Sequence, residues 1–194
     1  TQGFNFNIQG SQTTFSNFIG YQQLNAANKG LIELLYTQDN LNAQMDVGFK
    51  GHPNMGSIVL NQIQTSQDFI TFASAFQPVD RIFVISSIFG GTGAAGFPLL
   101  VNNIRGAGPA IPNFAFLNQA VIGALTVMPY FTLNNNANGQ GIDANTFVSK
   151  AIAALSYYDR NLNTPQVLNS MYYIGDSNSA HYPNNAGGQS QQNK

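Results

Sequence analysis

The sequence predicts an α/β fold with a mostly parallel sheet and flanking helices, and three observations predict it. Two apolar runs, Arg81 to Ile88 and Ala124 to Met128, have the composition of buried strands. Amphipathic helical patterns alternate with these runs along the chain. A glycine-rich turn, Gly90 to Gly96, joins the first strand to a helix. Alternating strands and helices favour a parallel sheet, whose ligands bind at the carboxyl ends of the strands.

Two segments upstream of the first strand have helical periodicity. Leucines recur at helical spacing between Leu24 and Tyr36, which predicts a helix there. The turn-rich segment Gly48 to Ser57 is predicted to be a loop, and it leads into an apolar helical face from Ile58 to Phe76. We therefore expect a second helix over 58–76.

The alternation continues downstream of the glycine-rich turn. Pro98 fits the first turn of a helix that begins near Phe97, because the missing N–H of proline would have no partner there. A further helix is predicted from Asn145 to Tyr158, and a short third strand from Ser170 to Ile174.

One domain over 1–180 and a flexible polar tail over 181–194 are the predicted organisation. The uncharged stretch from Ile111 to Leu133 is long enough to span a membrane, but Pro112 and Pro129 interrupt it. Two buried strands separated by a turn are expected there, and no membrane span. No cleavable signal peptide is visible, and a mature secreted chain would look the same. A cytoplasmic location is expected.

Composition excludes several classes of function. Only 8% of the residues are charged, against about 25% in an average domain. The net charge of -1 comes without a basic cluster, which disfavours nucleic acid as a partner. The chain has no cysteine, and its two histidines, His52 and His181, lie far apart in sequence. Disulfides, thiol nucleophiles and a zinc site are therefore not expected, and no metal ligand is assigned.

The glycine-rich turn suits a phosphate, and two common phosphate-binding motifs can be compared with it. The Walker A motif does not fit, because after Gly96 the residues Phe97 and Pro98 stand where it needs Lys and then Ser or Thr. The spacing of Gly90, Gly93 and Gly96 fits a dinucleotide-binding turn, but no acid for the ribose occurs between Asp80 and Asp143. A mere tight turn with close helix packing is a further alternative.

Three ordered segments over about residues 48–131 resemble the tubulin and bacterial FtsZ superfamily. Residues 80–98 are similar to the family's strand, its GGTG loop and the proline soon after it. Residues 51–56 resemble its Asn-Pro-x-x-Gly loop, with His52 in place of the asparagine. Residues 124–131 look like the family's Leu-Thr-Val strand that ends at Pro-Phe. The resemblance implies a Rossmann-like nucleotide-binding domain, and it continues more weakly to residue 178.

The resemblance implies GTP or GDP as ligand, with or without Mg²⁺, and self-association into cytoskeletal filaments. The implied nucleotide-binding residues are Gly90, Gly91, Thr92, Gly93, Ala94, Ala95 and Gly96 around the phosphates, Gly51, His52, Pro53, Asn54 and Gly56 near the terminal phosphate, and Asp176 and Asn178 near the base. In the family, an acidic residue of the next subunit activates water. No such acid can be assigned here, so the catalytic residues are unknown and GTP hydrolysis is left open.

Departures from the family pattern keep other functions open. The N-terminal glycine-rich loop is absent from residues 1–23, and Thr132 to Asn136 replace the residues expected near the ribose. Residues omitted from the chain would explain these losses, as would divergence with loss of hydrolysis. A structural or scaffold module without nucleotide is the first alternative, and an NAD(P)-binding reductase-like domain is the second. His52 has its own simpler interpretation, as a loop histidine without an acid beside it to orient the ring.

Overall fold

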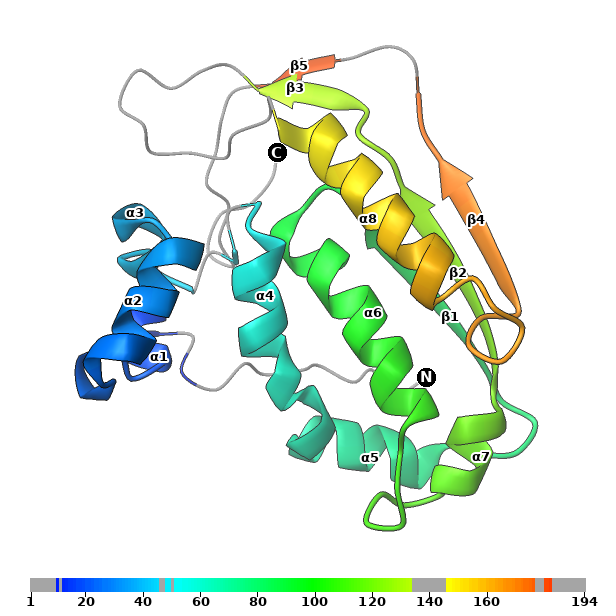
Figure 1. The fold of residues 1–194 in the computed structure, drawn as a ribbon. Helices are drawn as coiled ribbons and strands as arrows, with labels where there is room; N and C mark the ends of the chain where they lie inside the picture. Colours follow the sequence, from blue (N-terminus) through cyan, green and yellow to red (C-terminus); the bar gives the residue numbers. More distant parts are fainter. Residues whose placement is uncertain are drawn as a thin grey trace.

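A computed structural model describes residue 10 and residues 12–45, 48–49, 51–133, 146–176 and 180–182. These residues form a mixed α/β fold with short parallel sheets, which confirms the predicted class (Figure 1). None of the helices in these ranges combines the length and hydropathy needed to cross a membrane.

The central sheet has three parallel strands in the order β1-β2-β4, and the sequence predicted all three. Their bounds are β1 Arg81–Ser87, β2 Val121–Val127 and β4 Ser170–Ile174. Ser87 pairs with Val127, and Val127 pairs with Ile174, so the three carboxyl ends lie at one edge. This alignment places the segments that follow the strands along a common edge, where α/β folds bind ligands.

A second, two-stranded parallel sheet pairs β3, Phe131–Leu133, with β5, Ala180–Tyr182. β3 lies in the stretch 111–133 where two strands were expected, whereas β5 was not expected, since three residues are too few for a pattern of alternation to be recognised. His181 and Tyr182, the first residues of the predicted tail, belong to β5. The rest of that tail lies outside the described residues.

Upstream of the sheet, the predicted helix over 24–36 is confirmed as α2, Ala26–Leu35. The Asn25 side chain caps it by accepting a hydrogen bond from the N–H of Asn28. Short helices flank it, and their bounds are α1 Phe15–Phe18, the 3-10 turn η1 Tyr21–Gln23 and α3 Gln38–Leu41.

The predicted loop over 48–57 and helix over 58–76 divide differently in the structure. Helix α4 already begins at Pro53 and ends at Leu60, followed by the 3-10 turn η2, Asn61–Thr65, and α5, Gln67–Ala75. The break lies at Ser66, whose extended backbone and side-chain bond to the N–H of Phe69 start a new helix. The prediction of one continuous helix over 58–76 is therefore wrong.

Helix α6 spans Gly91–Arg105, so most of the glycine-rich turn is helical and only Gly90 remains as its N-cap. The prediction that α6 begins near Phe97 is wrong by almost two turns. Pro98 consequently lies inside the helix, where it cannot donate to the carbonyl oxygen of Ala94. The hydroxyl of Tyr158 donates to that oxygen instead, at 3.3 Å, and so replaces the missing helical bond.

The stretch predicted as two buried strands, 111–133, contains helix α7, Phe114–Gln119, before β2. Asn113 precedes α7 in the left-handed region with φ 52°. Its side-chain amide donates to the carbonyls of Ala73 and Phe76, which ties α7 to the end of α5. The predicted helix over 145–158 is confirmed as α8, Phe147–Asn161.

The hydrophobic core is built in two parts. The larger part lies between the sheet and the two helices that cover one of its faces, and includes Val101 of α6, Ile122 of β2 and Ala151 of α8. The smaller part fixes the N-terminal helices to α4 through Phe15, Tyr36 and other buried residues. This packing holds the amino ends of α4 and α6 near the carboxyl edge of the sheet.

Candidate functional site

A pocket of about 250 Å³ lies where α6 begins, next to the loop that precedes α4. Glycine backbone, two hydroxyl side chains and four aromatic rings line it. The lining residues are Gly48, Phe49, Gly51, Ser87, Phe89, Gly90, Gly91, Thr92, Gly93, Phe131 and Phe147. Five of the residues that the resemblance implies, Gly51 and Gly90 to Gly93, are thus brought together.

The amino end of α6 supplies hydrogen-bond donors to this pocket. The N–H groups in the first turn of a helix have no partner within the helix, and Gly90 offers no capping side chain. Thr92, which is exposed, and Ser87 add hydroxyl groups to the lining. Backbone amides and the positive end of the helix dipole together favour an anion at this position.

Several of these glycines are also needed for close packing. A Cβ atom on Gly93 would lie 2.5 Å from the carbonyl oxygen of Ser87, and one on Gly91 would lie 2.8 Å from the Cβ of Phe49. A Cβ on Gly56 would lie 2.6 Å from the carbonyl oxygen of Gly91. The glycine pattern therefore has a structural cause, which is the contact of α6 with β1 and with the start of α4.

Gly51 is the member of the second predicted loop that lines this pocket, and it has a left-handed φ of 77°. His52 is half-buried, and its Nε2 lies 3.2 Å from the Nδ2 of Asn40 in α3. Gly56 is buried against α6. The structure therefore directs His52 toward α3 and gives Gly56 a packing role.

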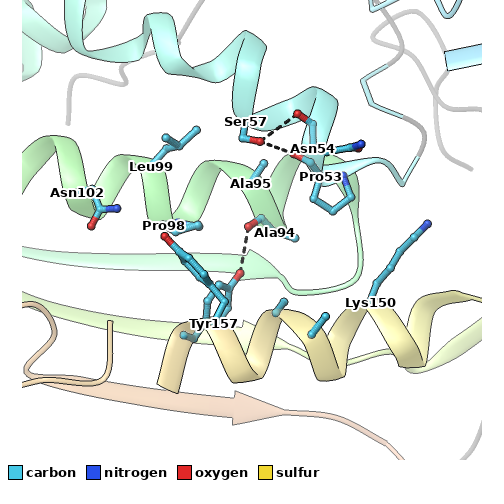
Figure 2. A pocket seen from close by; sticks show the side chains of 13 residues that line it. Pro53, Asn54, Ser57, Ala94, Ala95, Pro98, Leu99, Asn102, Lys150 and Tyr157 are labelled. Atoms are coloured by element: carbon cyan, nitrogen blue, oxygen red, sulfur yellow. Dashed lines mark hydrogen bonds between the residues drawn. The ribbon is translucent and has the colours of Figure 1, made fainter. Parts of the chain in front are cut away.

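Pro53 and Asn54 line a different pocket, of about 410 Å³, between α4, α6 and α8. Ala94 and Ala95 lie on its α6 side, and Figure 2 shows them facing this groove. The hydroxyl of Ser57 donates to the carbonyls of Pro53 and Asn54, each at 3.0 Å. These four implied residues are thus separated from the glycine pocket, while Gly96 packs near Leu60.

Asp176 follows β4 and so lies at the carboxyl edge of the sheet. It is not part of the glycine pocket, since β2 separates β4 from β1. Asn178 lies outside the described residues. Of the two residues predicted to read the base, Asp176 therefore lies at the expected edge of the sheet. The structure does not describe the other, Asn178.

Aromatic side chains are the part of this pocket that sequence reasoning missed. The ring centroid of Phe89 lies 4.9 Å from that of Phe147 and 5.5 Å from that of Phe131. Phe131 and Phe147 are also in contact, with centroids 5.6 Å apart. Phe89 adjoins Gly90 in sequence, which was the one available signal. The rings give the glycine pocket an apolar wall.

Among the residues that the structure describes, charge is scarce around the glycine pocket. Among the described residues, those that line it carry no ionisable side chain, and none of the described His, Asp and Glu groups could hold a metal ion. Lys150 lies one turn along α8 from Phe147 and belongs to the neighbouring groove. The described lining offers an anion neutral amides and hydroxyls, and it offers an accompanying Mg²⁺ only the hydroxyls of Ser87 and Thr92 among its side chains.

Comparison of the chain with family models, with curated proteins and with solved structures returns no match.

Proposed function

We propose that this chain binds a guanine nucleotide, GTP or GDP, through its phosphates at the amino end of α6. One observation carries the proposal: Gly51 and Gly90 to Gly93, which lie about forty residues apart in sequence, meet in one pocket at the carboxyl edge of a parallel sheet. Both segments also belong to the resemblance with tubulin and FtsZ. Self-association, which that resemblance implies, is part of the proposal.

The physics of the pocket supports a phosphate group. A helix terminus stabilises a nearby anion by about 0.3–1 kcal/mol, and α6 is long enough to have a developed dipole. Amides of the first turn can donate to phosphate oxygens. The aromatic wall lowers the local dielectric constant on its side of the pocket, which strengthens hydrogen bonds formed next to it.

The proposal covers binding and leaves hydrolysis aside. Among the described residues that line the pocket there is no acid or histidine to activate a water molecule. His52, the histidine nearest in sequence, is engaged with Asn40. In the family that the chain resembles, the group that activates water comes from a neighbouring subunit.

Thr92 offers a clean test, because it is exposed, lines the pocket and lies in the first turn of α6. Thr92→Glu places a carboxylate where the phosphates are proposed to bind, and the helix itself tolerates an acid at this position. We expect the dissociation constant for a fluorescent GTP analogue to rise at least about tenfold, which corresponds to about 1.4 kcal/mol.

Thr92→Gln is the matched control, since its side chain has the same size as that of Glu and no charge. Its affinity for the analogue should stay within about threefold of the wild type, a difference below about 0.7 kcal/mol. Equal affinity in the Glu and Gln variants would contradict a phosphate site at this position. Unlabelled GTP must compete with the analogue, and ATP should compete more weakly.

A scaffold that keeps the fold without nucleotide is the second candidate, and the glycine contacts favour it. Gly56, Gly91 and Gly93 are each required by packing alone, so their presence does not demand a ligand.

Thermal unfolding distinguishes the two functions. GTP at 100 times its dissociation constant should stabilise the folded state by about 2.7 kcal/mol, whereas a scaffold would show no shift with millimolar GTP. A shift with NADPH alone would indicate the reductase-like alternative.

A further inference from the structure

One face of the central sheet is apolar and exposed. Phe83 and Ile85 of β1, Val121 of β2, and Tyr172 and Ile174 of β4 point to this side and are exposed, Ile85 to 69%. The register aligns them, since Ile85 pairs with Leu125 and Leu125 with Tyr172. We call this surface the outer face. Parallel sheets are almost always covered on both faces, so an exposed one calls for a partner.

The chain topology explains why the outer face is bare. The strands follow one another in a single direction, β1-β2-β4, and right-handed crossovers then place their helices on the same side. Accordingly, α6 and α8 pack on the opposite face (Figure 1). Among the described elements, no helix has a place on the outer face.

The outer face is also flat. A Cβ atom on Gly123 would lie 2.8 Å from the ring of Phe83, so that ring lies across β2. There it approaches Tyr172, with ring centroids 6.4 Å apart. None of the described residues that point outward from the three strands is acidic, and Arg81 is the charged residue among them. Asp68 of α5 lines a pocket with Phe83 and Ile85 at the β1 edge. A helix with an apolar stripe can therefore pack over β2 and β4 without burying a carboxylate.

The same chain presents a helix of that kind. Helix α2 buries none of its ten described residues. Leu31, Leu34 and Leu35 form a stripe at helical spacing and are exposed, Leu34 to 83%. We call Leu31, Leu34 and Leu35 the leucine stripe.

Helix α2 is held away from the outer face of its own molecule. Tyr36, at its C-cap, is buried and donates to the carbonyl of Asn54 in α4, and it packs on Phe15. In Figure 1, α4 and α6 lie between α2 and the sheet. A contact between the leucine stripe and the outer face therefore has to be intermolecular.

We propose that the outer face binds the leucine stripe of a second copy of this chain. The two surfaces are different and lie on opposite sides of the molecule, so the contact is heterologous and leaves one free surface of each kind at the ends. Such contacts repeat and give open filaments unless a rotation closes them into a ring. The inference extends the self-association included in the proposed function, but the observations that carry it do not involve nucleotide.

The test uses the whole chain and two charge substitutions at exposed positions. Ile85→Glu disrupts the outer face, and Leu34→Glu disrupts the leucine stripe. Wild-type protein should increase in mass with concentration in sedimentation velocity, and each variant alone should remain a monomer. Val79→Glu, at an exposed apolar residue outside both surfaces, should assemble as the wild type does.

Mixing the two variants is the decisive step. The Ile85→Glu molecule keeps an intact leucine stripe and the Leu34→Glu molecule keeps an intact outer face, so their mixture should form a complex of one copy of each. Wild-type protein that stays monomeric, a Leu34→Glu variant that still assembles, or a mixture that remains monomeric would each overturn the inference. Circular dichroism confirms that the variants are folded. Loss of assembly with unchanged GTP affinity in Ile85→Glu would separate this contact from the nucleotide site.

Discussion

Tyr158 shows how a single residue can stabilise an irregular helix. Its side chain is almost fully buried, and its hydroxyl donates to the carbonyl oxygen that Pro98 leaves without a helical partner. Burial raises the pKa of Tyr158 well above 10, with further contributions from the nearby tyrosines Tyr173 and Tyr157. The neutral phenol is therefore favoured by the folded state.

A pH dependence follows from this raised pKa. The contribution of Tyr158 is fully present below pH 10, the value for the unfolded chain, and is lost as the pH rises from there toward the higher pKa of the folded protein. Tyr158→Phe should lower the free energy of unfolding by about 1 kcal/mol at pH 7, because the Ala94 carbonyl loses its donor. The loss of stability between pH 10 and pH 11 should be shallower in the variant.

Urea unfolding at pH 7, 9, 10 and 11 checks both parts of this prediction. One proton released on unfolding changes the unfolding free energy by about 1.4 kcal/mol for each pH unit. Tyr157→Phe, at a more exposed position on the same helix, serves as the control and should leave the stability at pH 7 within about 0.5 kcal/mol. If the free energy of unfolding falls equally steeply between pH 10 and pH 11 in the wild type and in Tyr158→Phe, the raised pKa does not belong to Tyr158.

At the scale of elements, glycine-to-alanine substitutions distinguish the effect of close packing on stability from the effect of helix propensity. Gly93→Ala adds a methyl group 2.5 Å from the Ser87 carbonyl oxygen, and β1 cannot move without disturbing its pairing with β2. We expect a loss of about 1–3 kcal/mol in the free energy of unfolding, measured by chemical denaturation.

Gly30→Ala is the matched control, since Gly30 lies inside α2 and a Cβ there would meet nothing within 4 Å. This substitution should raise the unfolding free energy by about 0.5–1 kcal/mol through helix propensity alone. Equal effects of the two substitutions would show that the contact between α6 and β1 is looser than described.

The elements also show what the sequence could predict. The three strands of the central sheet and helices α2 and α8 were predicted because their apolar periodicity is strong and local. The start of α6 was missed because glycines are poor helix formers, and only the tertiary contacts of Gly91 and Gly93 explain their place in a helix. Helix α7 was missed because its apolar run also fits a buried strand, and β5 was missed because it is short.

Only part of the candidate site could be read from the sequence, for a related reason. The glycines around α6 and Gly51 were recognised, since phosphate-binding turns have a local pattern. The separation of Pro53, Asn54, Ala94 and Ala95 into another groove depends on which side of α4 and α6 they occupy. The aromatic wall depends on the meeting of Phe89, Phe131 and Phe147, which come from three distant segments.

At the scale of the whole molecule, nucleotide binding and self-association are proposed for separate surfaces. The glycine pocket lies at the carboxyl edge of the sheet, whereas the outer face and the leucine stripe lie on opposite sides of the fold. If nucleotide strengthens assembly, it must bind the assembled form more tightly than the free form. Sedimentation with and without GTP, in wild type and Thr92→Glu, measures that coupling, and we expect assembly to be the same with and without GTP, because no residue of the outer face or the leucine stripe lines the glycine pocket.

The central claim is that phosphate binds to the amides at the start of α6, and amide chemical shifts test it most directly. Titration of the ¹⁵N-labelled protein with GTP should shift the N–H resonances of Gly91, Thr92 and Gly93 downfield, as charge-assisted hydrogen bonds form. Guanosine, which lacks phosphates, should not shift them. Unchanged resonances at these three positions, with GTP at millimolar concentration or with shifts elsewhere in the chain, would contradict the claim.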